Sequence, residues 1–428
     1  MISSFSYRDV PPVEIPEANF LATLVPREIE PPKPIETLVE EAVDHPIGSP
    51  RVEEYISPST RVLILVDDTT RQTPAWALLP SIFWRLEQRG CPRENTKILI
   101  AAGTHARMGP QDIEQKLGQR IPREYPVLIH HWKAEENLRP LGETADGTPI
   151  RVHRLLGESD LVIGVGQIVP HRVMGYTGGG TIVQPGVCGG EVTGYTHWKS
   201  ALYSGQEILG IAENPVRQEM EQIARKAGLR FIVNVVMDGQ HRVIHVVAGD
   251  PVAAHRQGAK HSLPIYGVSQ PELADIVVAE SYPTDIDLWV AAKGIYAAEL
   301  AVREGGVVIL VSPCTRGVAP EHPDVAGIGY HDLAAVQDMV ARKEITDLAA
   351  AAHIVHVGRV IRGRARGILV SPGIDVQTQW YLGFQPARTP QEALDRALGL
   401  VGPLAKVVVL RQGGHILPMV ERAKTAKG

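Results

Sequence analysis

The sequence RVLILVDDTTRQTP, residues 61–74, decides the fold class. The apolar run from Val62 to Val66 is typical of a parallel strand that is buried on both faces of a sheet. Polar residues follow the run at once, and residues 75–88 are then predicted to form a helix. The stretch therefore predicts a strand–loop–helix unit of an α/β domain.

The same pattern recurs along the chain and predicts two doubly wound α/β domains. Further strands are predicted at residues 97–103, 160–168, 230–237, 243–249, 274–281, 306–312, 367–371 and 405–411. Helices are predicted at residues 109–117, 214–227, 251–261, 288–304 and 390–400. A second series of strands starts at residue 274, so the residues just before it are expected to cross between the domains.

These patterns predict three parts of the chain. Residues 1–55 are interrupted by prolines and are expected to form an N-terminal arm that belongs to the first domain. Residues 56–265 are predicted to form an N-terminal α/β cofactor-binding domain, and residues 266–428 a C-terminal α/β domain. The active site is expected in the cleft between the two domains.

The composition favours a soluble globular protein. A chain of 428 residues is longer than one ordinary hydrophobic core supports. Its hydrophobic content of 44% and charged content of 21% are typical of globular proteins. A net charge of -5 gives no general attraction to nucleic acid or to an anionic membrane, and no apolar run reaches the length of a membrane span. With only three scattered cysteines, the chain is expected to be cytoplasmic.

A glycine-rich loop follows the strand predicted at residues 160–168. It reads PHRVMGYTGGG at residues 170–180, and ligands in α/β proteins bind beyond the carboxyl ends of strands. The glycines Gly178, Gly179 and Gly180 are predicted to offer backbone N–H groups to a phosphate or carboxylate. A flexible turn is the alternative, since the loop matches neither a Walker A nor a dinucleotide motif. The nearby His171 and His197 favour a binding site.

Chemically capable side chains also follow the other predicted strands. Asp68, Thr70 and Arg71 follow the first strand, and His105 follows the next. A helix cap explains Asp68 or Thr70 alone, and a surface loop explains His105 alone. Together they indicate a site, because an arginine can hold a carboxylate by two hydrogen bonds and histidines move protons or bind metals near neutral pH. Lys293 is expected to face Arg71 across the cleft.

Five motifs in order resemble the nickel-dependent lactate racemase family. They are DDTTRQTP at 67–74, AGTH at 102–105, PHRVMGYTGGG at 170–180 followed by QPG at 184–186, His197, and AAKG at 291–294. The resemblance implies two α/β domains and a nickel-pincer nucleotide, a pyridinium-3,5-bisthiocarboxylic acid mononucleotide supplied by cofactor-biosynthesis proteins. The implied substrate is a small 2-hydroxy acid. Its α C–H bond is a very poor acid, so hydride removal needs an electrophilic acceptor such as this group.

The resemblance also implies a role for each site residue. His197 becomes the nickel ligand, and His105 and His171 exchange the proton of the substrate hydroxyl. Arg71 and Lys293 hold the substrate carboxylate, and Asp68 supports them. The residues that would contact the nucleotide are Thr70, Gly178, Gly179, Gly180 and Thr181.

Two departures from the family pattern carry predictions. Thr181 stands where the family usually has a lysine that is joined to the cofactor, so the cofactor is predicted to bind non-covalently. Trp289 and Val290 stand where the family typically has a tyrosine and a glutamine. The substrate pocket is therefore expected to be more apolar and to suit aliphatic 2-hydroxy acids somewhat larger than lactate.

The sequence thus predicts a racemase or epimerase of a 2-hydroxy acid, with two alternatives. The missing lysine is also compatible with a non-catalytic protein that binds or carries the cofactor. The second alternative is a related isomerase or oxidoreductase on the same fold. The enzyme is favoured, because a carrier needs none of the substrate-handling residues His105, His171, Arg71 and Lys293.

Overall fold

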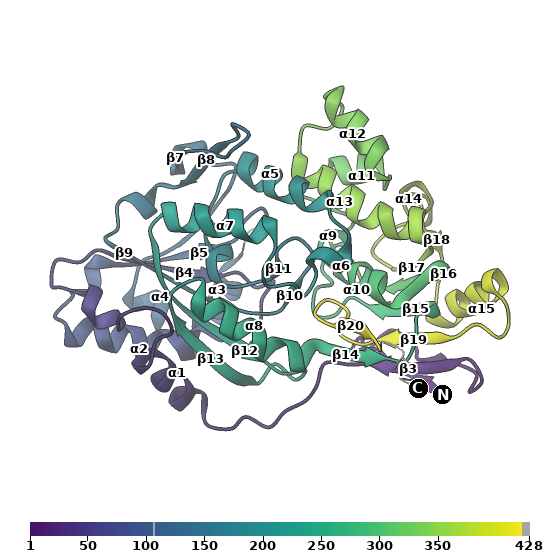
Figure 1. The fold of residues 1–428 in the computed structure, drawn as a ribbon, viewed down its shortest axis with the longest axis horizontal. Helices are drawn as coiled ribbons and strands as arrows, with labels where there is room; N and C mark the ends of the chain where they lie inside the picture. The colour runs from purple at the N-terminus through teal and green to yellow at the C-terminus, as the bar shows by residue number, and fades with distance from the viewer. Residues whose placement is uncertain (106–107, 422–428) are drawn as a thin grey trace, which may run out of the picture.

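The computed structural model describes residues 1–105 and 108–421, which form two α/β bodies side by side (Figure 1). Each body is built on one six-stranded sheet with helices on both faces. The predicted α/β class with parallel sheets is therefore confirmed. Among the described residues, no helix has the length and apolar character needed to cross a membrane.

The first sheet has the strand order β13-β12-β9-β4-β5-β6, and only the β12–β13 pair is antiparallel. Its strands are β4 (Val62–Asp67), β5 (Thr96–Ala101), β6 (Val127–Ile129), β9 (Leu161–Gln167), β12 (Leu229–Met237) and β13 (Val243–Gly249). The central strand β4 is buried along its whole length, as its apolar run predicts.

Helices cover both faces of this sheet. One face packs against α1 (Ile35–Asp44), α2 (Ala75–Gln88), α3 (Pro110–Leu117) and α4 (Ile121–Glu124). The other face packs against α5 (Gly190–Ala201), α7 (Pro215–Lys226) and α8 (Ala253–Tyr266). The antiparallel hairpin of β7 (Leu138–Glu143) and β8 (Pro149–His153) lies beside α5. Residues at the carboxyl ends of β4, β5 and β9 line a cavity, which is where ligands bind in open α/β sheets.

The second sheet has the order β18-β17-β16-β15-β19-β3 and is parallel throughout. Its strands are β3 (Phe20–Leu24), β15 (Ala274–Glu280), β16 (Val302–Val311), β17 (Ala365–Val370), β18 (Gln385–Pro386) and β19 (Val407–Leu410). Its helices are α9 (Leu288–Ala291), α10 (Lys293–Ala301), α11 (Asp324–Ile328), α12 (Leu333–Ala341), α13 (Leu348–Gly358), α14 (Val376–Leu382) and α15 (Pro390–Val401). The helix predicted at 288–304 is thus two helices, and it ends where β16 begins to pair with β15.

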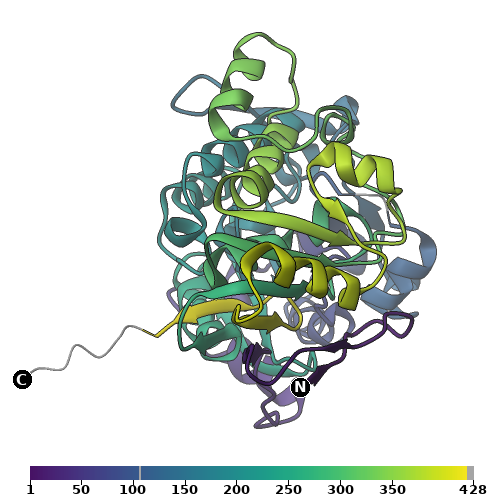
Figure 2. The same ribbon diagram turned by 90° about the vertical axis from the view of Figure 1, so that its right-hand side faces the viewer.

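The start of the chain corrects the predicted domain division. Strand β3 pairs with β19 at the edge of the second sheet, and Val13 and Ile15 are buried against that sheet's core. Figure 2 shows this dark purple segment beside the C-terminal body. The arm therefore belongs to the second domain up to Leu24 and contacts the first domain from Arg27 onward, where the N–H of Ile29 donates to Asp238 at 3.1 Å. A short strand that covers an exposed sheet edge removes a row of unpaired backbone groups.

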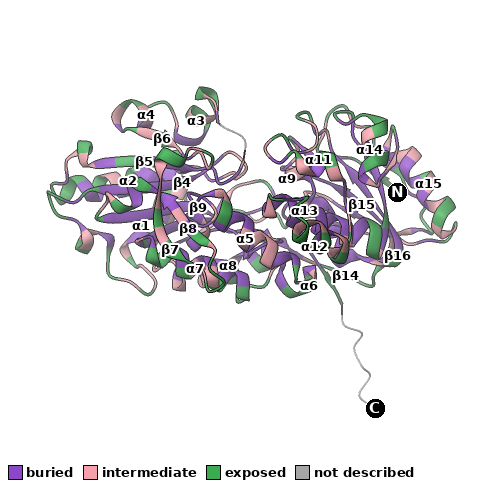
Figure 3. Cartoon of the chain, turned by 90° about the horizontal axis from the view of Figure 1, so that it is seen from above, coloured by how far each residue is buried: buried purple, intermediate pink, exposed green. Residues whose placement is uncertain are grey.

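The two bodies are joined at several places. The chain crosses after α8, because β14 (Gly267–Gln270) already pairs with β20 (Leu417–Val420) in a small separate sheet. Helix α5 packs against α13, and a Cβ added to Gly194 would lie 3.0 Å from Cβ of Leu348. Figure 3 shows these two helices next to each other at the junction, with the buried strands inside each body. Helix α5 is therefore fixed by both domains.

Candidate active site

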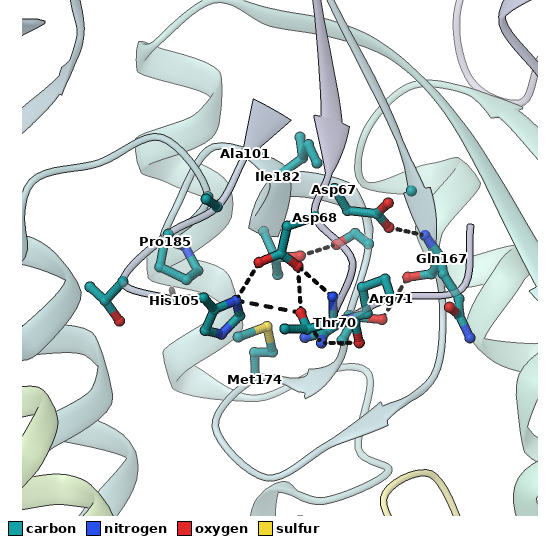
Figure 4. A pocket seen from close by; sticks show the side chains of 18 of the residues that line it. Asp67, Asp68, Thr70, Arg71, Ala101, His105, Gln167, Met174, Ile182 and Pro185 are labelled. Carbon is teal, nitrogen blue, oxygen red and sulfur yellow. Dashed lines mark hydrogen bonds and ion pairs between the residues drawn. The ribbon is translucent and has the colours of Figure 1, made fainter. Parts of the chain in front are cut away.

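A cavity of about 660 Å³ lies at the carboxyl ends of β4, β5 and β9. Figure 4 shows its polar wall, where side chains from these three strand ends point toward one another. Seven of the residues predicted for the site line the cavity: Asp68, Thr70, Arg71, His105, Gly178, Thr181 and His197. Carboxyl ends of parallel strands meet at one edge of a sheet, so residues distant in sequence come together here.

Asp68 organises the polar wall. Its Oδ2 accepts a hydrogen bond from Nδ1 of His105 at 2.7 Å, and its Oδ1 accepts from the Thr70 hydroxyl at 2.5 Å. Burial by itself raises the pKa of the Asp68 carboxyl, but His105, Thr70 and Arg71 hold it well below its ordinary value. The carboxylate is therefore ionised and fixes the proton of His105 on Nδ1, which leaves the lone pair of Nε2 free.

A second acidic residue, Asp67, supports the loop that carries Asp68 and Arg71. Asp67 accepts hydrogen bonds from the Thr73 hydroxyl at 2.5 Å and from Lys116 Nζ at 3.0 Å. Lys116 Nζ also donates to the backbone carbonyl of Arg71 at 2.7 Å and is itself buried. Sequence reasoning missed Lys116, because a lysine in a polar helix resembles any surface lysine. Its role is to hold the backbone that presents Arg71.

His197 is presented by α5 with one ring nitrogen already engaged. Nδ1 donates to the backbone carbonyl of Thr193 at 2.8 Å, so the lone pair of Nε2 remains available. Burial lowers the pKa of His197 to about 4, the Thr193 carbonyl opposes this shift, and His322 and His105 add to it. A neutral ring with an oriented Nε2 is the form of histidine that binds a metal ion.

His171 and Lys293 do not line the cavity, but both interact electrostatically with Arg71, which does. His171 lies in the hairpin of β10 (Pro170–His171) and β11 (Gly175–Tyr176), and its Nδ1 accepts the N–H of Val173 at 3.3 Å. Burial lowers its pKa well below the ordinary value, and Arg71 and Lys293 lower it further. His171 is therefore neutral, with its proton on Nε2. The charge interactions show that these groups share one neighbourhood.

Arg71 and Lys293 lack acidic partners. The Arg71 guanidinium donates to the carbonyl and the hydroxyl of Thr70, both at 3.1 Å, and forms no ion pair with a described carboxylate. Lys293 Nζ makes no hydrogen bond or ion pair within residues 1–105 and 108–421. Burial lowers the pKa of Lys293 far below its ordinary value, Arg71 lowers it further, and Asp68 and Asp287 oppose the shift. An anion between the two basic groups would relieve this repulsion.

The glycine run is explained mainly by backbone conformation. Gly178 and Gly179 have φ angles of 79° and 61°, and a Cβ on Gly179 would lie 2.9 Å from the carbonyl oxygen of Pro251. The Gly179 N–H already donates to Asn234 Oδ1 at 2.8 Å. Gly179 and Gly180 do not line the cavity. The Gly179 N–H is therefore already engaged, and of the three glycines Gly178 is the one that lines this cavity.

Thr181 lines the cavity, with its hydroxyl donating to the carbonyl of Gly178 at 3.0 Å. Two other potential nucleophiles near Thr181 in the sequence, Lys199 and Cys188, are both engaged elsewhere. Lys199 Nζ pairs with Glu219 at 2.5 Å, and Cys188 is fully buried with the pKa of its thiol raised by burial. No lysine or cysteine lines the cavity among the residues described.

A second chamber of about 710 Å³ adjoins the first and is lined from both domains. Trp289 and Val290 line it, as the sequence predicts for the substrate side. The Trp289 ring lies between the rings of His322 and His353, with centroid distances of 3.9 and 4.5 Å. Sequence reasoning missed His322, because it stands in a loop without any ligand spacing. Only the packing of the two domains brings it to the site.

Two family models match the chain. The model of the lactate racemase N-terminal domain matches residues 8–208, and that of the lactate racemase C-terminal domain matches residues 269–417. A protein named lactate racemase from Thermoanaerobacterium thermosaccharolyticum is 30% identical over 285 residues, which is 66% of this chain and 66% of that protein. A lactate racemase from Lactiplantibacillus plantarum is 29% identical over 387 residues, 88% of this chain and 89% of that protein.

Solved structures share the fold. The lactate racemase apoprotein from Thermoanaerobacterium thermosaccharolyticum superposes with a TM-score of 0.82 at 24% identity, covering 98% of this chain and 99% of that one. A Thermotoga maritima protein gives a TM-score of 0.73 at 22% identity, covering 90% of this chain and 97% of that one. The resemblance found in the sequence is therefore confirmed: the chain belongs to the lactate racemase family of isomerases.

Proposed function

We propose that the protein racemises or epimerises a 2-hydroxy acid, lactate-like or larger, by reversible hydride transfer to a nickel-pincer nucleotide. One observation carries this proposal. Arg71 and Lys293 form no ion pair with a described carboxylate, yet they lie together beside His105 and His171. This arrangement suits a small substrate that has one carboxylate and one hydroxyl to deprotonate.

The residues present fit the proposed group. His197 offers an oriented Nε2 to nickel, because Nδ1 is held by Thr193. Thr70, Gly178 and Thr181 line the same cavity and can contact the nucleotide end. When bound, the group supplies a reversible hydride acceptor, which no amino-acid side chain provides. We expect cofactor-biosynthesis proteins to be the partners that supply it, and Thr181 makes its binding non-covalent.

The two histidines carry complementary tautomers. His105 has its proton on Nδ1, held by Asp68, so its Nε2 can accept the proton of the substrate hydroxyl. His171 receives the N–H of Val173 on Nδ1, so its Nε2 carries a proton that it can donate. His105 can thus act as a base, and the neutral His171 ring can donate a hydrogen bond to a substrate oxygen. A planar 2-keto acid held between such a pair can take back hydride on either face, which interconverts the stereoisomers.

The two alternatives make different demands on the site. A carrier of the cofactor needs His197 and the cavity, but it gains nothing from two half-buried basic groups that form no ion pair with a described carboxylate. An oxidoreductase on the same fold would release the 2-keto acid instead of returning the hydride. Product analysis therefore separates all three functions.

The test is to produce the protein together with the cofactor-making enzymes, measure bound nickel, and follow a panel of 2-hydroxy acids by chiral chromatography. We expect His197→Ala to lose nickel. His105→Ala and His171→Ala should keep nickel and lose roughly 10²- to 10⁴-fold in racemisation rate. His245→Ala is the control, since His245 stacks on His261 in an outer strand, away from the cavity. Full nickel occupancy in His197→Ala, or wild-type rates in both other variants, would refute the assignment.

A further inference from the structure

The second chamber is placed to receive the side chain of the substrate. It shares five residues with the main cavity: Asp68, Thr70, Thr104, His105 and Trp289. A 2-hydroxy acid whose hydroxyl meets His105 therefore has this chamber beside its C2 atom. The chamber wall includes the apolar side chains of Ile286, Val290, Ala319 and Pro320.

His322 belongs to this wall and has one ring nitrogen without a described partner. Its side chain is only 2% exposed, and Nδ1 donates to Oδ2 of Asp347 at 2.6 Å. Asp347 also accepts backbone N–H groups at the start of α13, so its carboxylate acts only as an acceptor. Nδ1 must then carry a proton. The other ring nitrogen, Nε2, is buried and has no hydrogen-bond partner among the described residues.

The His322 ring is held rigidly. It stacks on Trp289 with an interplanar angle of 12°, and its other neighbour is Trp132 of the first domain, with a centroid distance of 5.7 Å and an angle of 15°. The Lys133–Glu321 ion pair at 3.1 Å joins the same two segments. The ring cannot turn Nε2 toward another hydrogen-bond partner without losing the bond to Asp347. A buried polar atom without a partner is costly, which indicates that a ligand atom completes it.

The chemistry of Nε2 selects the ligand atom. A hydroxyl group can donate to Nε2 when the ring is neutral and accept from it when the ring is charged, whereas a methyl group can do neither. A second substrate carboxylate is disfavoured, because among the described residues the chamber wall carries Asp68, Asp112, Asp287 and Glu321 against the one cation of Arg316. The wall thus favours an uncharged side chain with a hydroxyl.

We propose that His322 determines specificity and that the substrate is a 2-hydroxy acid with a further hydroxyl on its side chain, bonded to His322 Nε2. This inference rests on the proposed function and names its substrate class. It replaces the expectation of a wholly aliphatic substrate, because that expectation was based only on Trp289 and Val290. The apolar wall still packs against the carbon chain of the substrate, while His322 binds the side-chain hydroxyl.

Two isosteric substrate pairs test the proposal. In each pair a terminal methyl is replaced by a hydroxyl: 2-hydroxybutanoate against glycerate, and 2-hydroxypentanoate against 2,4-dihydroxybutanoate. For the loaded enzyme we expect kcat/KM to favour the hydroxylated member at one chain length or both. In His322→Phe, which keeps a ring between the tryptophans, that ratio should fall by roughly 10- to 100-fold. The aliphatic members should change by only a few-fold, and His245→Phe should leave all ratios unchanged.

Calorimetric binding of the same pairs to the protein without cofactor gives a second readout. This measurement does not require turnover, and on wild-type protein it does not depend on whether the variant folds. Absence of racemisation with every 2-hydroxy acid would refute the proposed function, while the ratio of Kd values would still decide the role of His322. Equal or weaker binding of both hydroxylated members, an unchanged ratio in His322→Phe, or a preference for malate would overturn the inference.

Discussion

The substitution Asp68→Asn isolates the role of one negative charge at the site. Asp68 is 4% exposed and receives three hydrogen bonds from two residues: His105 Nδ1 at 2.7 Å, the Thr70 hydroxyl at 2.5 Å and the Thr70 N–H at 3.1 Å. Asparagine has the same shape but only one acceptor oxygen. Because Oδ1 serves both groups of Thr70, the asparagine oxygen should stay there, and its NH₂ group then faces His105.

This exchange reverses the tautomer of His105. Nδ1 must accept from the asparagine amide, so the ring proton moves to Nε2, the atom that the substrate hydroxyl needs as a base. Loss of a positioned general base costs roughly 10²- to 10⁴-fold in rate. We expect kcat to fall within that range while nickel content stays unchanged, because His197 is held separately by Thr193.

The assay is chiral analysis of initial rates on nickel-loaded protein, with metal content measured on the same samples. Asp332→Asn is the matched control: Asp332 lines neither chamber, and its carboxylate accepts the N–H of Ala335 at 2.9 Å. The control should stay within about threefold of wild type, as expected when no acid–base group is touched. The double variant Asp68→Asn with His105→Ala should be no slower than His105→Ala alone, since Asp68 acts through His105. A normal kcat in Asp68→Asn, or full additivity in the double variant, would show that the carboxylate does not position His105.

Two further predictions concern the cofactor and the response to acid. Thr181 stands in the linking position, and Lys199 and Cys188 are engaged elsewhere, so the cofactor should bind without a covalent bond. Intact-mass measurement under denaturing conditions should therefore give the bare polypeptide, and native mass measurement should show the nickel-containing adduct. An adduct that survives denaturation would contradict non-covalent binding. Desolvation lowers the pKa values of the buried His130 and His153 from 6.5 to about 4. Between these pH values the unfolded chain binds protons that the folded chain does not, so the free energy of unfolding falls as the pH falls from 6.5 toward 4. Each should contribute a slope of up to about 1.4 kcal/mol per pH unit, and urea unfolding midpoints that are equal at pH 7 and pH 5 would contradict this sign.

The sequence alone determined the class of the fold and the core of the site. A strand buried on both faces requires a continuous apolar run, and such runs mark β4, β5, β9 and β12 without any knowledge of the structure. Asp68 and His105 were predictable because each directly follows such a run, and parallel strands deliver their carboxyl ends to one edge. The motif resemblance then attached roles to these positions.

Only the tertiary structure decided how distant segments meet. Nothing in the local pattern of residues 20–24 distinguishes an edge strand of the second sheet from part of an arm on the first. The glycine run by itself predicts three free backbone N–H groups. In the structure Asn234, which lies more than fifty residues further along the chain, accepts the hydrogen bond of the Gly179 N–H. His322 becomes a candidate only when Asp347 fixes one nitrogen and the domain contact with Trp132 buries the ring. Periodicity reports which face of an element is buried, whereas the partner of each polar atom is set by contacts between elements, which the local sequence does not encode.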